Sequence, residues 1–346
     1  MSEWENQYNP FNSWKLMAHA PLWKSLSDRQ ASPPVTITID PINACNFSCP
    51  YCNASKVTGS GHKIDQKLNA PLAKFLKDWG VKTVCVAGGG EPTLHPSIIK
   101  DLVDAGIRVG IVTNGSLMDR CPDLLSLCDW VGVSVDAATP KTFEKVKETN
   151  SFIKVIDNIE LLATLMNPLK KKSSGYGIFY KYLILPGNEH EIAAAAKLAR
   201  TLGCKGFHAR PAGIAGVNVE VVKDQCNIAK TYGTNEFGVY TVTHKVGKNL
   251  AANNNFKKCW GCVMTCVITP HPKGFNIDLC CDQRDKYRLA EGLTEPSQIL
   301  EVWNSKKHWK IHDSINPQKC PRCTYGPHAK LFENCIDTDN MTYDFI

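Results

Sequence analysis

Three cysteines with the spacing Cys-x3-Cys-x2-Cys are the residues of this sequence best suited to chemistry. Cys45, Cys49 and Cys52 follow a β-branched run and share one short loop. Three thiolates on one loop fit an iron–sulfur cluster, whereas a structural zinc site or a closed [4Fe–4S] cube takes four protein ligands. One iron of a cube would then stay open to a non-protein ligand, which is typical of catalysis. A zinc knuckle or buried free thiols are the alternatives.

A glycine run one βα unit downstream supports the catalytic interpretation. Gly88, Gly89 and Gly90 end an apolar stretch and lead into Glu91. Glycines let the backbone approach a ligand closely, and a carboxylate accepts hydrogen bonds from an ammonium group. The alternative is an ordinary glycine turn. The position of the glycine run, one βα unit after the cysteine loop, argues against this alternative.

The two motifs together resemble the radical S-adenosylmethionine (SAM) superfamily, which also has an aromatic residue before the third cysteine, here Tyr51. The resemblance implies that the amino and carboxylate groups of SAM chelate the open iron of a [4Fe–4S] cluster. An electron from this cluster would cleave SAM to a 5'-deoxyadenosyl radical. The resemblance also implies that Gly89, Gly90 and Glu91 hold the SAM amino group.

Further site residues follow from the same resemblance. Asn114 and Ser134 would lie near the SAM ribose and Lys181 near its carboxylate. Arg210 ends the last predicted strand, and we expect it to act with Tyr51 in catalysis or to bind a substrate anion. Simple turn, capping or ion-pair roles are the alternatives for these residues.

The predicted elements supply a scaffold for these residues. From residue 35, apolar strand-like runs alternate with amphipathic helical stretches, as a parallel sheet with crossover helices requires. Six strands are expected, and the βα rhythm is expected to stop after residue 211. Six strands match the partial (β/α)6 barrel of the resembled family, an α/β fold that binds ligands at the carboxyl ends of its strands. The expected strands span 35–40, 81–87, 108–113, 130–136, 177–185 and 206–210.

A second group of cysteines lies near the C-terminus, at Cys259, Cys262, Cys266, Cys280, Cys281, Cys320, Cys323 and Cys335. This segment resembles the auxiliary-cluster extension called twitch or SPASM, a small domain built from a β-hairpin and helices. The one-cluster twitch pattern implies a second [4Fe–4S] cluster, with Gly274 in the hairpin turn. Its implied ligands are Cys262, Cys280, Cys320 and Cys323.

Rival ligands remain open in this segment. Cys259, Cys266 and Cys281 are equally available, adjacent Cys280 and Cys281 cannot be separated by spacing, and Cys335 follows the final pair. A structural zinc site is the alternative, because zinc accepts four thiolates. We therefore expect an N-terminal extension over 1–34, a barrel over 35–215 and an auxiliary iron–sulfur domain over 216–346.

Composition excludes several classes of protein. The chain has 346 residues, is 43% hydrophobic and 21% charged, and contains no apolar run long enough for a membrane span. The first residues lack the pattern of a signal peptide, so we expect a cytoplasmic protein. Sixteen cysteines then favour metal binding over disulfides. The net charge of +7 is mild and dispersed, which makes nucleic-acid binding unlikely.

The resemblance predicts a radical SAM oxidoreductase that dehydrogenates a small molecule such as a sugar or cyclitol, with the auxiliary cluster receiving an electron. Flavodoxin or ferredoxin would supply the reductant. The alternatives are a redox-neutral epimerisation, decarboxylation or rearrangement, modification of a peptide, and a non-catalytic iron–sulfur electron carrier. The open iron and Glu91 argue against a simple carrier.

Overall fold

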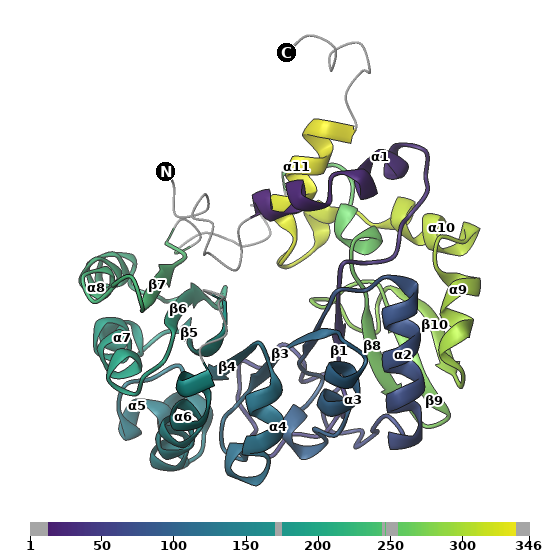
Figure 1. Ribbon diagram of the computed structural model, residues 1–346. Helices are drawn as coiled ribbons and strands as arrows, with labels where there is room; N and C mark the ends of the chain where they lie inside the picture. The colour runs from purple at the N-terminus through teal and green to yellow at the C-terminus, as the bar shows by residue number, and fades with distance from the viewer. Residues whose placement is uncertain (1–12, 170–174, 244–245, 247–254, 337–346) are drawn as a thin grey trace.

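The computed structural model describes residues 13–169, 175–243, 246 and 255–336. Their strands form one curved sheet of ten strands, and the helices that connect the strands lie along its outer face (Figure 1). Within the described residues, no helix is long and apolar enough to cross a membrane.

Six parallel strands form the barrel part of the sheet and confirm the predicted α/β fold. They are rich in β-branched and aromatic residues, and most of their side chains are buried, as parallel strands covered by helices require. The strands pair in chain order, with Thr38 opposite Cys85 and Ser134 opposite Lys181. They are β1 (Thr36–Ile39), β2 (Thr83–Val86), β3 (Arg108–Thr113), β4 (Trp130–Ser134), β5 (Gly177–Ile184) and β6 (Gly206–Pro211).

The βα rhythm continues after residue 211, so the expected end of the rhythm is wrong. Helix α8 (Val219–Lys230) begins where the Asn218 side chain accepts a hydrogen bond from the Val221 amide, and β7 (Gly238–Thr241) pairs parallel with β6. Gly213, Gly216 and Gly233 lie in the connections of these elements, and Asn218 caps α8. The parallel sheet therefore runs past residue 215, where the barrel was expected to end.

The C-terminal hairpin joins the same sheet. Strand β8 (Val267–His271) pairs parallel with β1, and β9 (Gly274–Asp278) and β10 (Arg288–Leu293) follow antiparallel. The full order is β10-β9-β8-β1-β2-β3-β4-β5-β6-β7. Gly274 begins β9 rather than occupying the turn, and a Cβ there would lie 2.0 Å from the Leu293 carbonyl oxygen. The close approach of β10 therefore requires glycine.

Amphipathic helices cover the sheet. In α6, buried Val155, Ile159, Leu162 and Met166 repeat at helical spacing and face the core, and α2 ends at Gly80 with a φ of 108°. The connecting helices are α2 (Asn69–Trp79), α3 (Ile98–Asp104), α4 (Pro122–Leu127), α5 (Pro140–Lys147), α6 (Phe152–Met166) and α7 (Ile192–Thr201). The C-terminal segment adds α9 (Ile299–Val302), α10 (Lys306–Ser314) and α11 (Gly326–Ile336).

The described part of the N-terminal extension packs against the C-terminal helix. The 3-10 helix Ser13–His19 and α1 (Pro21–Ser27) contact α11, so the two ends of the described chain meet (Figure 1). They enclose a cavity of about 390 Å³ with Thr36, Thr83 and Arg108, which begin β1, β2 and β3. This cavity lies at the amino ends of those strands, whereas the cysteine loop follows the carboxyl end of β1.

Trp303 joins three parts of the chain, and its removal tests this packing. Its indole N–H donates to the carbonyls of Ala31 and Ser32, and its ring lies 5.5 Å from that of Trp79. We expect Trp303→Ala to lower the free energy of unfolding by about 3 to 5 kcal/mol, and Trp303→Phe to remove only the hydrogen bonds, worth about 1 kcal/mol. Urea unfolding should show Leu300→Ala, an exposed neighbour, to be nearly neutral. Equal losses of unfolding free energy in Trp303→Ala and Leu300→Ala would contradict the role of Trp303 in joining these segments.

Candidate functional site

The three-cysteine loop leaves the carboxyl end of β1, where the sequence placed it. Cys45, Cys49 and Cys52 are all half-buried. Burial raises the pKa of the Cys45 thiol, the Phe47 amide opposes this by donating to its sulfur at 3.4 Å, and the charges of Glu91, Cys49 and Cys52 add to the rise. The three thiols therefore lie close enough to influence one another, as ligands of one centre must.

The three thiols of this loop suit a cubane cluster better than a single metal ion. Within the described residues, no three His, Cys, Asp or Glu side chains converge on a point that would hold a single metal ion. A cubane cluster makes a different demand, because its thiolates bind separate irons at separate corners. Three neighbouring, half-buried thiols on one loop fit that arrangement.

The glycine run packs directly against the cysteine loop. A Cβ on Gly90 would lie 2.2 Å from the Ala44 carbonyl oxygen, and one on Gly89 would lie 2.4 Å from Asn43 Oδ1. The Glu91 amide donates to the Ala44 carbonyl at 2.8 Å. The glycines are thus required by the contact between the two loops, whatever ligand they also approach.

The Glu91 carboxylate is buried and accepts four hydrogen bonds from its own chain. Oε1 accepts from the Thr93 amide at 3.0 Å and from the hydroxyls of Thr93 and Thr113, each at 2.6 Å. Oε2 accepts from the Asn114 amide at 2.7 Å. A carboxylate oxygen has two lone pairs, so Oε2 can accept one further bond. Glu91 therefore positions the loops after β2 and β3. Among the described residues Oε2 accepts one hydrogen bond only, and its contact with a SAM ammonium group stays a prediction.

Asn114 and Ser134 end neighbouring strands of the barrel. The Asn114 side chain donates to Asn46 at 2.9 Å and lies 4.0 Å from the Cys45 sulfur. Ser134 is half-buried at the end of β4. Asn114 thus borders the cysteine loop directly, and the expected contacts of both residues with the SAM ribose stay predictions.

Tyr51 is held by a buried carboxylate. Its hydroxyl donates to Asp136 at 2.8 Å, and the ammonium of Lys147 binds the same carboxylate oxygen at 2.5 Å. The other oxygen of Asp136 accepts from the Leu183 amide at 2.6 Å. Burial, followed by the charge of Asp136, raises the pKa of Tyr51, so its hydroxyl stays protonated. Tyr51 therefore anchors the cysteine loop. Lys147, which forms an ion pair with Asp136, was not predicted from the sequence.

A second buried carboxylate links the cysteine loop to the C-terminal hairpin. Arg284 donates from Nε to Asp40 at 2.5 Å and from a terminal nitrogen at 3.0 Å, and Asp40 immediately follows β1. Burial raises the pKa of Asp40, and the charge and hydrogen bonds of Arg284 oppose that rise. Arg284 also donates to the Cys281 carbonyl. One guanidinium thus joins the loop that leaves β1 to the loop that carries the second cysteine group.

Lys181 and Arg210 occupy different depths of the barrel. The Lys181 ammonium lies 2.6 Å from His208 Nδ1 and 5.5 Å from the centre of the Trp130 ring, at the start of β4. Burial, and then the charge of Arg210, lower the pKa of Lys181 to about 7. Arg210 is exposed near the carboxyl end of β6. The contact of Lys181 with a SAM carboxylate stays a prediction.

Five thiols of the second cysteine group are neighbours. The charge of Cys259 acts on each of Cys280, Cys320 and Cys323, while Cys262 interacts with Cys259 and Cys280. A hydrogen bond from the fully buried Cys262 thiol lowers the pKa of Cys259. Cys259 therefore competes with the expected ligand Cys262 for the fourth position.

The remaining rivals are likewise buried or half-buried. Cys266 is buried, and burial, with Asp278 nearby, raises its pKa to about 12. Cys281 is half-buried, and burial raises its pKa, followed by the charges of Asp282 and Cys280. The side chain of Cys335 lies outside the described residues.

Asp282 connects the two halves of the second cysteine group. Its carboxylate accepts from Arg322 Nε and from the Thr324 amide, each at 2.7 Å. Arg322 lies between Cys320 and Cys323, so the carboxylate orders the Cys-x2-Cys turn against the loop that contains Cys280.

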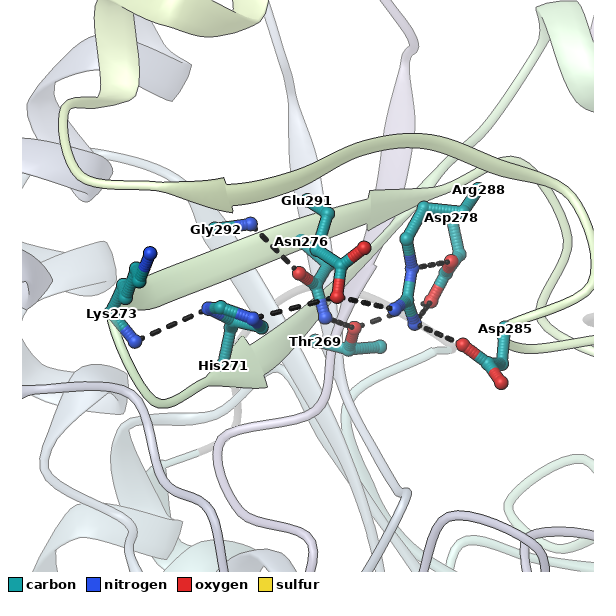
Figure 2. A network of polar contacts seen from close by, with 9 residues as sticks. All are labelled: Thr269, His271, Lys273, Asn276, Asp278, Asp285, Arg288, Glu291 and Gly292. Carbon is teal, nitrogen blue, oxygen red and sulfur yellow. Dashed lines mark hydrogen bonds and ion pairs between the residues drawn. The ribbon is translucent and has the colours of Figure 1, made fainter.

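A polar network fixes the base of that loop (Figure 2). Arg288 in β10 donates to buried Asp278 in β9 at 3.0 Å, and a terminal nitrogen lies 2.8 Å from Asp285 within the loop. Thr269 in β8 also donates to Asp278 at 3.2 Å. The three strands therefore meet at the buried carboxylate of Asp278, and Arg288 links the loop to it through Asp285. These contacts limit where the loop can lie.

A cleft of about 530 Å³ lies between the two cysteine groups. Residues 52–57 of the first loop form one wall, and residues 281–286 with Pro321 and Arg322 form the other. Cys52 and Cys281 both line it, so segments of the two groups face each other across one cleft.

Comparison with known proteins identifies the barrel. Residues 39–199 match the family model of the radical SAM superfamily. The barrel belongs to that superfamily. The family uses a [4Fe–4S] cluster and SAM, and the binding of this pair by the three-thiol loop and Glu91 stays a prediction.

Two relatives share part of this radical SAM chain. The probable GTP 3',8-cyclase of Saccharolobus islandicus (strain M.14.25 / Kamchatka #1) is 27% identical over 188 residues, which cover 52% of this chain and 58% of that protein. The S-adenosylmethionine-dependent nucleotide dehydratase of Selenomonas ruminantium is 33% identical over 132 residues, covering 35% and 47%. The chain thus spans about half the length of these relatives.

Solved structures resemble the whole fold. Streptococcus suis SuiB bound to S-adenosylmethionine has a TM-score of 0.61 at 15% identity, covering 92% of this chain and 77% of that one. The structure of anSMEcpe with bound AdoMet and Cp18Cys peptide has a TM-score of 0.58 at 16% identity, covering 86% and 88%. At these identities the likeness shows the fold alone.

The Asp40–Arg284 pair gives a test of how the two cysteine loops are joined. Arg284→Met leaves the carboxylate buried without its cation, so we expect the free energy of unfolding to fall by about 3 to 5 kcal/mol. Urea unfolding followed by circular dichroism measures the loss. Lys74→Met, which breaks an ion pair whose side chains are 77% and 62% exposed, should change little and serves as the control. A similar small change in both variants would show that the pair does not hold the loops.

The free acceptor of Glu91 gives a second test. We expect Glu91→Gln to weaken SAM binding to the reconstituted protein by about one to two orders of magnitude, because a charge-assisted hydrogen bond worth about 1.5 to 3 kcal/mol is lost. Thr113→Val removes one internal bond to Oε1 and leaves Oε2 untouched. Equilibrium SAM binding should therefore distinguish the variants, and equal losses would mean that Glu91 acts only by positioning the loops.

Proposed function

We propose that this protein is a radical SAM enzyme that oxidises its substrate by two electrons with the help of an auxiliary cluster. Cys45, Cys49 and Cys52 would hold the SAM-cleaving [4Fe–4S] cluster. When bound, that cluster and SAM supply a 5'-deoxyadenosyl radical, which takes a hydrogen atom from a C–H bond. A second cluster, when bound, would supply an acceptor for the substrate's second electron, and a base or solvent would take the proton.

The observation that carries this proposal is the arrangement of the two cysteine groups. Cys52 of the first group and Cys281 of the second line one cleft, and the Asp40–Arg284 pair joins the loops on which the two groups lie. The family model covers the first group and supports SAM cleavage there. The physical link between the two loops supports a second centre that would take part in electron transfer.

The second centre needs four ligands to be closed. Cys262, Cys280, Cys320 and Cys323 are the proposed ligands, and Cys259, whose charge acts on the last three, is the rival for the fourth position. Four thiolates leave no vacancy for another SAM, so this centre suits electron transfer. A small molecule such as a sugar or cyclitol is the proposed substrate, and flavodoxin or ferredoxin the proposed reductant.

A redox-neutral reaction on a nucleotide is the second candidate. The relatives named a GTP cyclase and a nucleotide dehydratase match 52% and 35% of this chain. Modification of a peptide is a further candidate, since SuiB binds the precursor peptide SuiA and anSMEcpe binds the Cp18Cys peptide in solved structures. Their low identity to this chain supports the fold only. Product analysis separates these candidates, because only the oxidation delivers an electron to the auxiliary centre.

Iron analysis and product formation test the two-cluster arrangement. After anaerobic reconstitution we expect about eight irons per chain, and about four in the Cys45→Ala/Cys49→Ala/Cys52→Ala variant, at four irons per cube. With dithionite and SAM, the parent should form 5'-deoxyadenosine and the triple variant none. Cys320→Ala/Cys323→Ala should retain some 5'-deoxyadenosine formation and lose the oxidised product.

Single variants assign the disputed ligand. Cys262→Ala should lose about four irons and Cys259→Ala should keep about eight, and the reverse result would assign Cys259 as the fourth ligand. Zinc at the second site, or only four irons in the fully reconstituted parent, would defeat the auxiliary-cluster proposal and favour the redox-neutral reaction.

A further inference from the structure

Lys147 is a buried cation beside the cysteine loop. It ends α5, and only 4% of its side chain is exposed. Its ammonium lies 2.5 Å from the carboxylate of Asp136 and 5.3 Å from the centre of the ring of Tyr51, a residue of the cysteine loop itself. Desolvation offsets much of the attraction in a buried ion pair, so such a pair is weak evidence for a role in stability alone. Its place beside the predicted cluster ligands therefore requires a further explanation.

The position of the ammonium is fixed through Asp136. One oxygen of this fully buried carboxylate binds Lys147 and accepts from the Tyr51 hydroxyl at 2.8 Å, and the other accepts from the Leu183 amide at 2.6 Å. The Asn188 side chain donates to the Asp136 carbonyl at 2.8 Å, and the Asp136 backbone has a φ of 62°. That left-handed conformation is uncommon for residues other than glycine and persists only where the surroundings enforce it. Contacts from several segments thus hold the charge of Lys147 in one place.

The charge of Lys147 acts on the cysteine loop. An ammonium has three donors, and among the described residues that of Lys147 makes one hydrogen bond, to Asp136. Burial raises the pKa of the Cys49 thiol, and the charge of Lys147 is the foremost cause that opposes this rise, whereas the charge of Asp136 adds to it. Burial, the charges of Asp136 and Cys49, and hydrogen bonds to both residues raise the pKa of Tyr51. Cys49, Tyr51, Asp136 and Lys147 therefore form one connected group.

A cation in such a place has a defined effect on an iron–sulfur cluster. Reduction adds one negative charge to the cluster, and its reduction potential depends on nearby charge, on hydrogen bonds to the sulfurs and on exposure to solvent. A fixed positive charge lowers the free energy of the reduced form and so raises the potential, and a buried charge is screened less than one in water. A carboxylate at a similar distance has the opposite effect.

We propose that Lys147 raises the reduction potential of the cluster held by Cys45, Cys49 and Cys52, and that Asp136 holds it in position to do so. This inference rests on the proposed function, because that function assigns the SAM-cleaving cluster to those thiols. The electron comes from the proposed flavodoxin or ferredoxin, or from dithionite in its place. Because the two charges act in opposite senses, neutralising Lys147 and neutralising Asp136 should move the potential in opposite directions. A pair with only a structural role would give no such change of sign.

Redox titrations followed by electron paramagnetic resonance test this inference on the anaerobically reconstituted parent and its variants. The signal of the first cluster is the one that the Cys45→Ala/Cys49→Ala/Cys52→Ala variant lacks. We expect Lys147→Met to lower the potential by about 59 mV, a tenfold change in the equilibrium of one-electron reduction, and Asp136→Asn to raise it by a similar amount. Lys147→Arg and the double variant Lys147→Met/Asp136→Asn should stay close to the parent, because neither changes the net charge. Lys145→Met, exposed on the same helix, is the matched control and should titrate like the parent.

An unchanged potential in Lys147→Met would overturn the inference, as would shifts in the same direction in both single variants. Loss of the first cluster from both single variants, measured by iron content, would also overturn it, because the pair would then act only by holding the loop. Where Lys147→Met alone fails to fold or to bind iron, Asp136→Asn decides, and its potential must rise. Failure of the proposed function is recognised separately, because a parent that shows the signal but forms no 5'-deoxyadenosine would lack the radical chemistry and still permit the potentials to be compared.

Discussion

The cysteine loop depends on buried carboxylates that lie beneath it. The segment after β1 contains almost no regular structure, so hydrogen bonds from the ladder cannot fix its shape. Asp40 at its start and Asp136 opposite Tyr51 are both fully buried. A buried carboxylate is tolerated only when it is paired and hydrogen-bonded, so each draws its partners into one geometry. The same bonds that satisfy the carboxylates thereby position the thiols.

This constraint extends to the C-terminal segment. Asp40 reaches across to Arg284, and Asp282 two residues earlier binds Arg322 in the Cys-x2-Cys turn. Two ion pairs therefore run in series from the barrel to the second cysteine group. Strand β8 adds backbone pairing to β1 itself. The expected auxiliary domain is in this respect an extension of the barrel sheet, and the two thiol groups share a common framework.

The sequence predicted the parts of the molecule that depend on local pattern. Six strands and the cysteine loop after β1 follow from alternation, β-branched residues and turn chemistry, and the resemblance to the twitch extension implied the C-terminal hairpin. Helix α8 and β7 were missed because glycines and asparagines around them indicated loops, although Asn218 in fact caps the helix. The Asp40–Arg284 pair joins residues 244 positions apart, and no local pattern encodes such a contact. Spacing also could not separate Cys259 from Cys262, because their choice depends on how two loops meet.

The Gly-Gly-Glu segment shows how one motif serves both structure and chemistry. Close approach to Ala44 and Asn43 accounts for its glycines, and four internal hydrogen bonds account for the burial of Glu91. Neither requirement involves a ligand. The acceptor that remains on Oε2 would be available to SAM only because the internal hydrogen bonds hold the carboxylate in place. The proposed binding role of Glu91 therefore depends on its structural role. A shorter carboxylate would lose the loop contacts first, and the orientation of any bound SAM would be lost with them.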